Sequence, residues 1–147
     1  MRVCDVMSMP AVTAPAHASL AEVIRLMVDR AVGCVVVVEE GGVPCGIVTD
    51  RDLAVRGLGT GRPPAARVAE VMSPRPVTVG TADDVHAAYR TMRRTGVRRL
   101  PVVDGGRVVG VVSVDDLLLD VFQRLADLLG PVARSILEEA PDPAQRK

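Results

Sequence analysis

Residues 96–117 read GVRRLPVVDGGRVVGVVSVDDL and contain two valine-rich runs, Leu100 to Val103 and Gly110 to Ser113. The Asp-Gly-Gly connection between the runs is a turn signal, so the pair predicts a β-hairpin. A helix is expected to begin at Asp115, shortly after the second run. Two arginines precede the first run, and an apolar strand in a core has no use for a double positive charge at its entrance.

Residues 31–53, AVGCVVVVEEGGVPCGIVTDRDL, carry the same pattern, with strands expected from Cys34 to Val38 and from Gly46 to Thr49. The match extends upstream, where Val6-Met7-Ser8 corresponds to Val71-Met72-Ser73. The register shift between the copies is 65 residues before the turn and 64 after it, because one residue is lost there. Agreement in order across one short gap indicates two copies of a single unit.

Each copy predicts the order β-α-β-β-α. Ser19 and Glu22 form a capping-box pattern, S-x-x-E, at the start of the first helix, and Asp84 is the expected cap of its counterpart in the second copy. Asp50 and Asp115 are the expected caps of the later helices. Because a unit of about 50 residues buries little core alone, we expect an α/β (α+β) fold in which the two valine-rich sheets pack together.

The repeat also sets the predicted boundaries. The first unit spans residues 3–56, a glycine- and proline-rich linker spans 57–67, and the second unit spans 68–120. Residues 121–147 are expected to form a C-terminal helical extension and tail. An apolar stripe predicts that the helix ends at Gly130-Pro131, followed by a short helix over 132–140 and a frayed tail. The stripe consists of Leu117, Val121, Leu125 and Leu128.

Composition argues against several classes of function. The chain of 147 residues has 18 basic and 18 acidic side chains, one Tyr, one Phe and no Trp, which disfavours nucleic-acid binding by charge or by stacking. We expect no enzyme and no required cofactor, since no metal-ligand spacing, nucleophile–base pair or phosphate-loop motif is visible. The longest apolar run, CVVVV, is too short to span a membrane, and no signal-peptide pattern opens the sequence, which predicts a soluble cytoplasmic protein.

The three cysteines are odd in number and widely spaced, at Cys4, Cys34 and Cys45. We interpret them as buried or neutral thiols in a reducing compartment. A redox-sensing thiol is the alternative, and Cys34 is its candidate.

The motifs VMSMPAVT and VMSPRPVT, the segment GVRRLPVVD, and the endings GIVTDRDL and GVVSVDDL together resemble the CBS domain, over residues 3 to about 120. The tandem arrangement is similar to a stand-alone CBS pair, or Bateman module. The resemblance implies that the units pack through their sheets about a pseudo-twofold axis, with two clefts that each hold an adenosine-containing ligand such as AMP, ADP, ATP or S-adenosylmethionine. It also implies a disc-like homodimer and a regulatory role, in which ligand binding changes conformation and signals to the dimer or to an unidentified protein partner.

The first implied cleft centres on Thr49 and Asp52, at the end of a strand and in the first turn of the following helix. Free N–H groups at a helix start favour a phosphate, and a carboxylate suits a ribose diol. The resemblance completes this cleft with residues of the second unit, which are Val77, Thr78, Arg98, Arg99 and Pro101. Val77 and Thr78 would flank the base, and the arginines would face phosphates.

The second implied cleft centres on Ser113 and Asp116. Its residues from the first unit are Val12, Thr13, Gly33 and Cys34. Gly33 and Cys34 stand where the first cleft has its arginines, so we expect the second cleft to lack a cationic clamp. It is then empty, weaker, or suited to a less charged ligand.

Each interpretation has an alternative. Capping alone would explain Asp52 and Asp116, because carboxylates at helix starts stabilise the helix without any ligand. A surface role is the alternative for one of Arg98 and Arg99, since adjacent strand residues face opposite ways. For function, the alternative is a CBS pair that binds no ligand and acts as a dimerisation or protein-interaction module.

Overall fold

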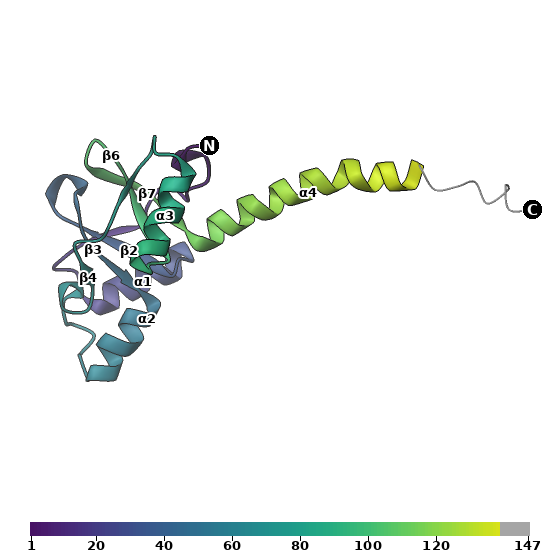
Figure 1. The fold of residues 1–147 in the computed structure, drawn as a ribbon. Coiled ribbons are helices and arrows are strands. Elements are labelled where there is room, and N and C mark those ends of the chain that lie inside the picture. Colours follow the sequence, from purple (N-terminus) through teal and green to yellow (C-terminus); the bar gives the residue numbers. More distant parts are fainter. Residues whose placement is uncertain (139–147) are drawn as a thin grey trace, which may run out of the picture.

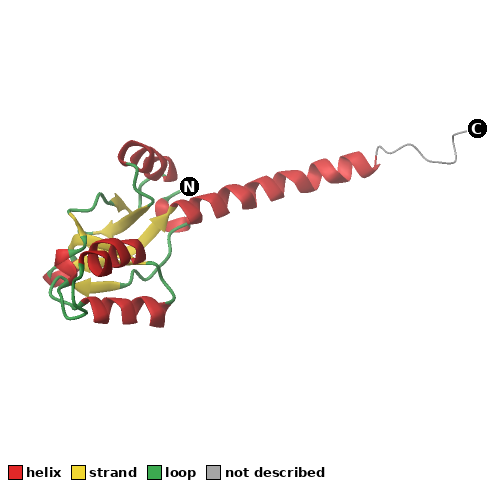
Figure 2. Cartoon of the chain, turned by 90° about the horizontal axis from the view of Figure 1, so that it is seen from below, coloured by secondary structure: helices red, strands yellow, loops and turns green. Residues whose placement is uncertain are grey.

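The computed structural model describes residues 1–138 and contains two β-sheets with helices around them (Figures 1 and 2). The first sheet has the strand order β1 (Thr13–Pro15), β2 (Cys34–Val38), β3 (Pro44–Thr49) and β4 (Ser73–Pro74). The second has the order β5 (Val79–Gly80), β6 (Arg99–Asp104) and β7 (Arg107–Ser113). The longer helices are α1 (Leu20–Arg30), α3 (Val85–Thr95) and α4 (Val114–Glu138), and α2 (Asp50–Asp52) is a short helical segment. The predicted α/β (α+β) class is confirmed, as is the C-terminal helix.

Both predicted hairpins are present. β2 pairs antiparallel with β3, and β6 with β7, while β1 and β5 add as short parallel strands. The predicted caps of α1 and α3 are also present. The Glu22 N–H donates to Ser19 Oγ at 3.1 Å, the Ser19 N–H donates to Glu22 Oε2 at 2.7 Å, and the His86 N–H donates to Asp84 Oδ1 at 2.8 Å. These bonds satisfy N–H groups that a first helical turn leaves free.

The predicted caps of the later helices are wrong by one or two residues. The cap of α2 is Thr49 rather than Asp50, because the Asp52 N–H donates to Thr49 Oγ1 at 3.2 Å. In the same way the Asp116 N–H donates to Ser113 Oγ at 3.1 Å, so Ser113 rather than Asp115 caps α4. A hydroxyl at the strand end already supplies the acceptor that the helix start needs.

The path after α2 continues through a π-helical turn (Leu53–Gly57) and a 3₁₀ turn (Leu58–Thr60). Helical structure therefore reaches into the segment predicted as a linker. The unit boundaries at 3–56, 57–67 and 68–120 stay predictions.

The prediction that a helix ends at Gly130-Pro131 is wrong, because α4 is continuous from Val114 to Glu138. Proline lacks an N–H and usually breaks a helix. Here residues 121–138 are exposed, so water can solvate the carbonyl that this missing N–H leaves without a donor. The predicted tail and the end of the predicted last helix fall on residues 139–147, outside the described residues.

Each hydrophobic core contains side chains from both units. The first core, around β2 and α1, includes Val68 from the 3₁₀ turn (Val68–Glu70) that opens the second unit, and Val71, which directly follows that turn. The second core, around β6 and α3, includes Val3 from the 3₁₀ turn (Val3–Asp5) that opens the first unit. The opening turns are thus exchanged, and neither core is complete without the other unit.

Backbone pairing continues this exchange. Ser73 in β4 pairs with Ile47 in β3, and Ser8 forms an isolated antiparallel bridge with Val111 in β7. The two pairs are equivalent under the register shifts of 65 and 64 residues. The exchange therefore follows a pseudo-twofold relation between the units.

The sheets also pack against each other. Along β2, Val35 and Val37 belong to the first core, so the alternation of a strand turns Val36 to the other face. Pro101 is placed in the same way along β6. Val36 and Pro101 are fully buried although they belong to neither core. The predicted sheet-to-sheet packing is confirmed.

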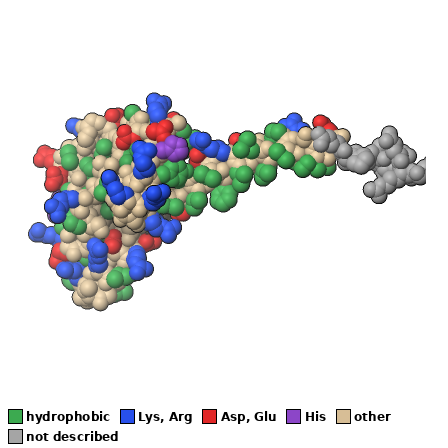
Figure 3. All heavy atoms as spheres, viewed as in Figure 1, with side chains coloured by type: hydrophobic (Ala, Val, Ile, Leu, Met, Phe, Trp, Pro, Cys, Tyr) green, Lys and Arg blue, Asp and Glu red, His purple; other side chains and the backbone are tan. Residues whose placement is uncertain are grey.

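Helix α4 extends away from the two sheets (Figure 1). Apolar side chains follow one another along it (Figure 3). Within residues 1–138, no helix combines the length and the apolar character needed to cross a bilayer.

Two glycines permit the exchanged segments to approach the sheets. A Cβ atom on Gly46 would overlap the Met72 side chain, and one on Gly110 would lie 2.8 Å from both Met7 Sδ and the Ser8 carbonyl oxygen. The methionine of each unit therefore packs over a glycine in the second hairpin strand of the other.

We expect Gly110→Ala to lower the free energy of unfolding by about 1–3 kcal/mol, the usual cost of overpacking. The added methyl group meets the Ser8 carbonyl, a backbone atom that no rotamer change can move. Gly46→Ala is the matched control, because its methyl group meets the flexible Met72 side chain and should cost less. Urea unfolding followed by circular dichroism measures both. An equal or smaller loss for Gly110→Ala would contradict this packing.

Candidate functional site

A cavity of about 400 Å³ lies between the units and has the size of a ligand-binding pocket. We call it the first cleft. It is lined by five of the seven residues predicted for it: Thr49, Asp52, Val77, Arg98 and Arg99. A carboxylate of one unit and two guanidinium groups of the other thus share one cavity.

Two residues predicted for the first cleft do not line it. Pro101 is fully buried between the sheets. Thr78 is half-buried outside the lining, next to Val77, which does line the cleft. Neighbouring residues of an extended segment face opposite ways, and this turns Thr78 away.

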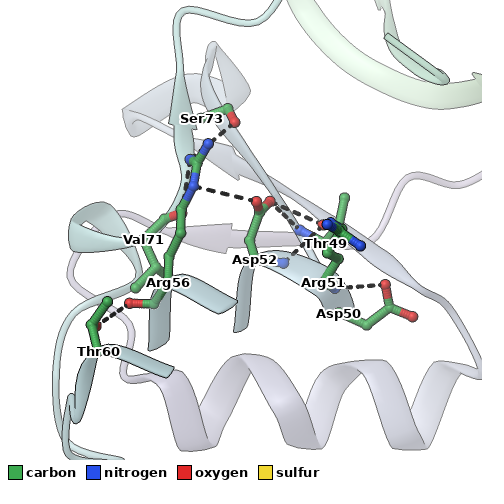
Figure 4. Close-up of polar contacts among 8 residues, drawn as sticks. All are labelled: Thr49, Asp50, Arg51, Asp52, Arg56, Thr60, Val71 and Ser73. Atoms are coloured by element: carbon green, nitrogen blue, oxygen red, sulfur yellow. Dashed lines mark hydrogen bonds and ion pairs between the residues drawn. The ribbon is translucent and has the colours of Figure 1, made fainter. Parts of the chain in front are cut away.

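The hydroxyl and carboxylate at the base of the first cleft bind each other (Figure 4). Asp52 Oδ2 accepts from the Thr49 N–H at 2.9 Å and from Thr49 Oγ1 at 3.0 Å. Asp52 Oδ1 lies 3.8 Å from the Arg56 Nε, and Arg56 Nη1 lies 3.4 Å from Ser73 Oγ. Asp52 therefore does help to cap α2, as the alternative interpretation held. Its Oδ1 atom makes weaker contacts than Oδ2.

Free N–H groups for a phosphate, which the sequence predicted at the start of α2, are not found there. The Asp50 N–H donates to the Gly33 carbonyl at 3.0 Å, and the Arg51 N–H donates to Asp50 Oδ1 at 2.8 Å. The N–H groups of Thr49 and Asp52 serve the cap. An anion beside the start of α2 must therefore be held mainly by side chains.

Two arginines that were not predicted, Arg51 and Arg75, also line the first cleft. Arg75 has a φ angle of 51°, a left-handed conformation that is unfavourable for residues other than glycine. Adjacency to predicted residues is the sequence signal that could have found them, because Arg51 precedes Asp52 and Arg75 lies two residues before Val77.

The first cleft carries an excess of positive charge. Its lining contains four arginines and two aspartates, which leaves two positive charges unbalanced at neutral pH. Guanidinium groups present planar donors that match phosphate oxygens. The charge of the cleft therefore suits an anionic ligand.

A second cavity, of about 150 Å³, is smaller than typical ligand pockets, and we call it the second cleft. It is lined by five of the six residues predicted for it: Val12, Gly33, Cys34, Ser113 and Asp116. The sixth, Thr13, is exposed and lines a separate hollow beside α1. Val12 and Thr13 are neighbours, so strand alternation separates them as it separates Val77 and Thr78.

The two clefts are built from equivalent positions. Thr49 and Asp52 correspond to Ser113 and Asp116, and Val77 corresponds to Val12. Asp116 Oδ2 accepts from the Ser113 N–H at 2.8 Å and from Ser113 Oγ at 2.7 Å, repeating the arrangement at Asp52. In the second cleft, however, Ser8 Oγ donates to Asp116 Oδ1 at 3.2 Å. Both carboxylate oxygens of Asp116 are thus hydrogen-bonded.

The second cleft has Gly33 and Cys34 where the first has Arg98 and Arg99, as predicted, but it still contains a cation, because Arg99 lines both clefts. Arg99 pairs with Ser113 in the β6–β7 hairpin, so the backbone of Arg99 lies beside a residue of the second cleft. Neither Arg98 nor Arg99 is purely a surface residue, which was the alternative interpretation for one of them. Arg98 is exposed but lines the first cleft, and Arg99 is half-buried between the clefts.

Cys34 lies close to Arg99, Asp50 and Asp116. Burial raises the pKa of the Cys34 thiol, and the two carboxylates add to that rise, while the Arg99 guanidinium opposes it. The net pKa is above the ordinary value of 9.0, so the thiol is neutral at physiological pH. Since the thiolate is the reactive form, this environment does not favour a redox sensor.

These features define a tandem-repeat protein with two pseudo-symmetric clefts at the interface of its units. The CBS domain model matches residues 3–58 and again residues 68–122. The chain belongs to the CBS-domain family, and its two copies form a CBS pair.

Relatives agree with this assignment. The CBS domain-containing protein YhcV of Bacillus subtilis is 36% identical over 116 residues, which cover 79% of this chain and 82% of YhcV. The protein MK0525 of Methanopyrus kandleri is 36% identical over 99 residues. That match covers 66% of this chain but only half (50%) of the length of MK0525.

Solved structures show the same fold. The CBS domain pair of protein MJ0100, in complex with 5′-methylthioadenosine and S-adenosyl-L-methionine, has a TM-score of 0.76 at 26% identity, over 84% of this chain and 98% of that one. The CBS domain protein PAE2072 from Pyrobaculum aerophilum, complexed with AMP, has a TM-score of 0.72 at 29% identity, over 80% of this chain and 90% of that one.

The raised pKa of Cys34 predicts slow alkylation. In a Cys4→Ser, Cys45→Ser variant, the reaction rate with iodoacetamide should rise with pH to a midpoint higher than that of the same thiol in the unfolded chain, because only the thiolate reacts. Mass spectrometry of quenched samples measures the rate, and the same variant unfolded in urea is the control. A midpoint below that of the unfolded control would revive the redox-sensor alternative.

Proposed function

We propose that this CBS pair is a regulatory module that binds an adenine nucleotide in the first cleft. The observation that carries the proposal is the shared lining of that cavity by Asp52 of one unit and Arg98 and Arg99 of the other. Solved CBS pairs of similar fold are complexed with AMP or with S-adenosyl-L-methionine and 5′-methylthioadenosine, which supports an adenosine-containing ligand.

The chemistry of the residues that line the cleft suits such a ligand. The Asp52 carboxylate is an acceptor for ribose hydroxyl groups, and the arginines donate to phosphate oxygens. With few aromatic rings in the chain, aliphatic groups such as those of Ile47, Val77 and Val97 would contact the base. The excess positive charge favours AMP, ADP or ATP over the cationic S-adenosylmethionine.

A ligand in this cleft would bridge the two units. It could shift their relative tilt only by the difference between its affinities for the two arrangements. We propose that this shift, rather than any chemical step, is the output of the module. The receiver is a second copy of the chain or a partner protein.

We expect isothermal titration calorimetry to detect AMP binding. Arg98→Ala should weaken it by about tenfold to a hundredfold, because a charge-assisted hydrogen bond contributes about 1.5–3 kcal/mol. Arg93→Ala is the matched control, since Arg93 is exposed on α3 and lines neither cleft. ATP and S-adenosylmethionine should be titrated in parallel. No heat from any of the three, in protein shown to be free of carried-over ligand, would contradict the proposal.

The alternative function, a dimerisation module, is favoured by a separate observation on α4. Leu118, Val121, Leu125, Leu128 and Val132 alternate at spacings of three and four residues, as in a coiled-coil seam, and all are exposed. Leu128 is 69% exposed. A single helix with such a stripe is marginal in water, so we propose that it pairs with α4 of a second copy. The interface would serve with or without a ligand in the clefts.

Multi-angle light scattering should therefore find a dimer. Leu128→Arg should shift the protein to monomer, because a charge in the seam would be buried without a partner. Gln123→Arg is the matched control, placed on the same helix but outside the stripe. A monomeric wild-type protein, or a dimer that survives Leu128→Arg, would argue against this interface.

A further inference from the structure

Arg99 is the residue that the two clefts share. It lines the first cleft together with Arg51, Arg75 and Arg98. It is also the one cation among the residues that line the second cleft, where the other charge is Asp116. The first cleft has three arginines besides Arg99, whereas the second cleft has no other cation.

The geometry around Arg99 explains how one side chain reaches both clefts. Its Nη2 atom lies 3.5 Å from the position that a Cβ atom on Gly33 would occupy, so the missing side chain of Gly33 leaves room for the guanidinium. Asp50 Oδ2 lies 3.3 Å from that same position. Asp50 lines the first cleft and Asp116 the second, so each of the two cavities that Arg99 lines also contains a carboxylate.

Neither carboxylate holds Arg99 in place. Among the ion pairs of residues 1–138, none within 4.0 Å involves Arg99. Arg56, by contrast, is engaged with Asp52 and Ser73 (Figure 4). Arg99 is thus a half-buried cation without a fixed partner between two cavities.

We propose that Arg99 couples the two clefts, so that a phosphate-containing ligand in the first weakens the binding of a second such ligand in the other. An anion in the first cleft draws the Arg99 guanidinium toward itself. The second cleft is then left with the negative charge of Asp116 alone, which disfavours an anion and favours a neutral or cationic ligand. Linkage makes the effect reciprocal. This inference rests on the proposed nucleotide binding and adds that the two sites are unequal and antagonistic.

Methyl NMR can follow the clefts separately while AMP is the probe. The Ile47 methyl group reports on the first cleft and the Ala11 methyl group on the second, because each lines only one of them. In the wild-type protein, Ile47 should shift at low AMP concentration and Ala11 only at much higher concentration.

The coupling is isolated by disabling the first cleft with the double substitution Asp52→Asn, Arg98→Ala. Arg99 then stays available to the second cleft, and the dissociation constant read at Ala11 should fall by about tenfold relative to wild type, a typical size for coupling between sites. In an Arg99→Gln background, the same double substitution should leave the Ala11 value unchanged. Retained methyl dispersion in each spectrum shows that the variants are folded.

The outcomes separate the two proposals. Suppose that Ile47 shifts but the dissociation constant read at Ala11 is the same with and without the double substitution. This result overturns the coupling and leaves nucleotide binding intact. A fall at Ala11 that persists in the Arg99→Gln background also overturns it, because Arg99 would not carry the effect. No shift at either methyl group overturns nucleotide binding and the coupling together.

Discussion

The exchange of opening segments between the units is the constraint on which the rest of the structure depends. Val3 completes the core of the second unit, and Val68 and Val71 complete that of the first. Gly46 and Gly110 permit this, since a side chain at either position would occupy the space of a methionine from the other unit. A unit of about 50 residues is marginal by itself, and the exchange makes the two units one cooperative body.

The clefts follow from the same crossing. After Ser8 and Ser73 pair with the opposite sheet, the chain runs on through Val12 and Val77, which line the clefts. The opposite wall of each cleft is formed by the opposite unit, where a strand ends and the next helix starts: Thr49 and Asp52 in the first cleft, Ser113 and Asp116 in the second. Each cleft is therefore bounded by both units wherever the exchange occurs. A ligand in either cleft contacts both units at once, which is what a sensor of their relative position requires.

Much of this arrangement could be predicted from the sequence because it depends on patterns among residues that are close together in the chain. Valine-rich runs and turn residues predicted the hairpins, a capping box predicted α1, and the repeat predicted Asp52 and Arg98 in one cavity. Long-range choices were not visible. A repeat cannot show whether its opening turn packs on its own unit or on the other. Nor could it show which of two adjacent residues turns inward: Val12, Thr13, Val77 and Thr78 were all predicted for the clefts, but only the two valines line them. Arg99 was assigned to one cleft, because its reach past Gly33 depends on tertiary packing.

The two clefts share the residues that stabilise the fold. They differ at positions that the fold does not need. Thr49 with Asp52, and Ser113 with Asp116, cap helices, so their hydroxyl and carboxylate groups serve stability whether or not a ligand is present. Arg75, Arg98 and Arg99 cap nothing with their side chains, and the equivalent positions in the other cleft hold Pro10, Gly33 and Cys34. Charge selectivity can therefore change in one cleft without loss of the shared architecture. The ligand preference of each cleft depends on its cations rather than on the hydroxyl–carboxylate pair that makes the clefts look alike.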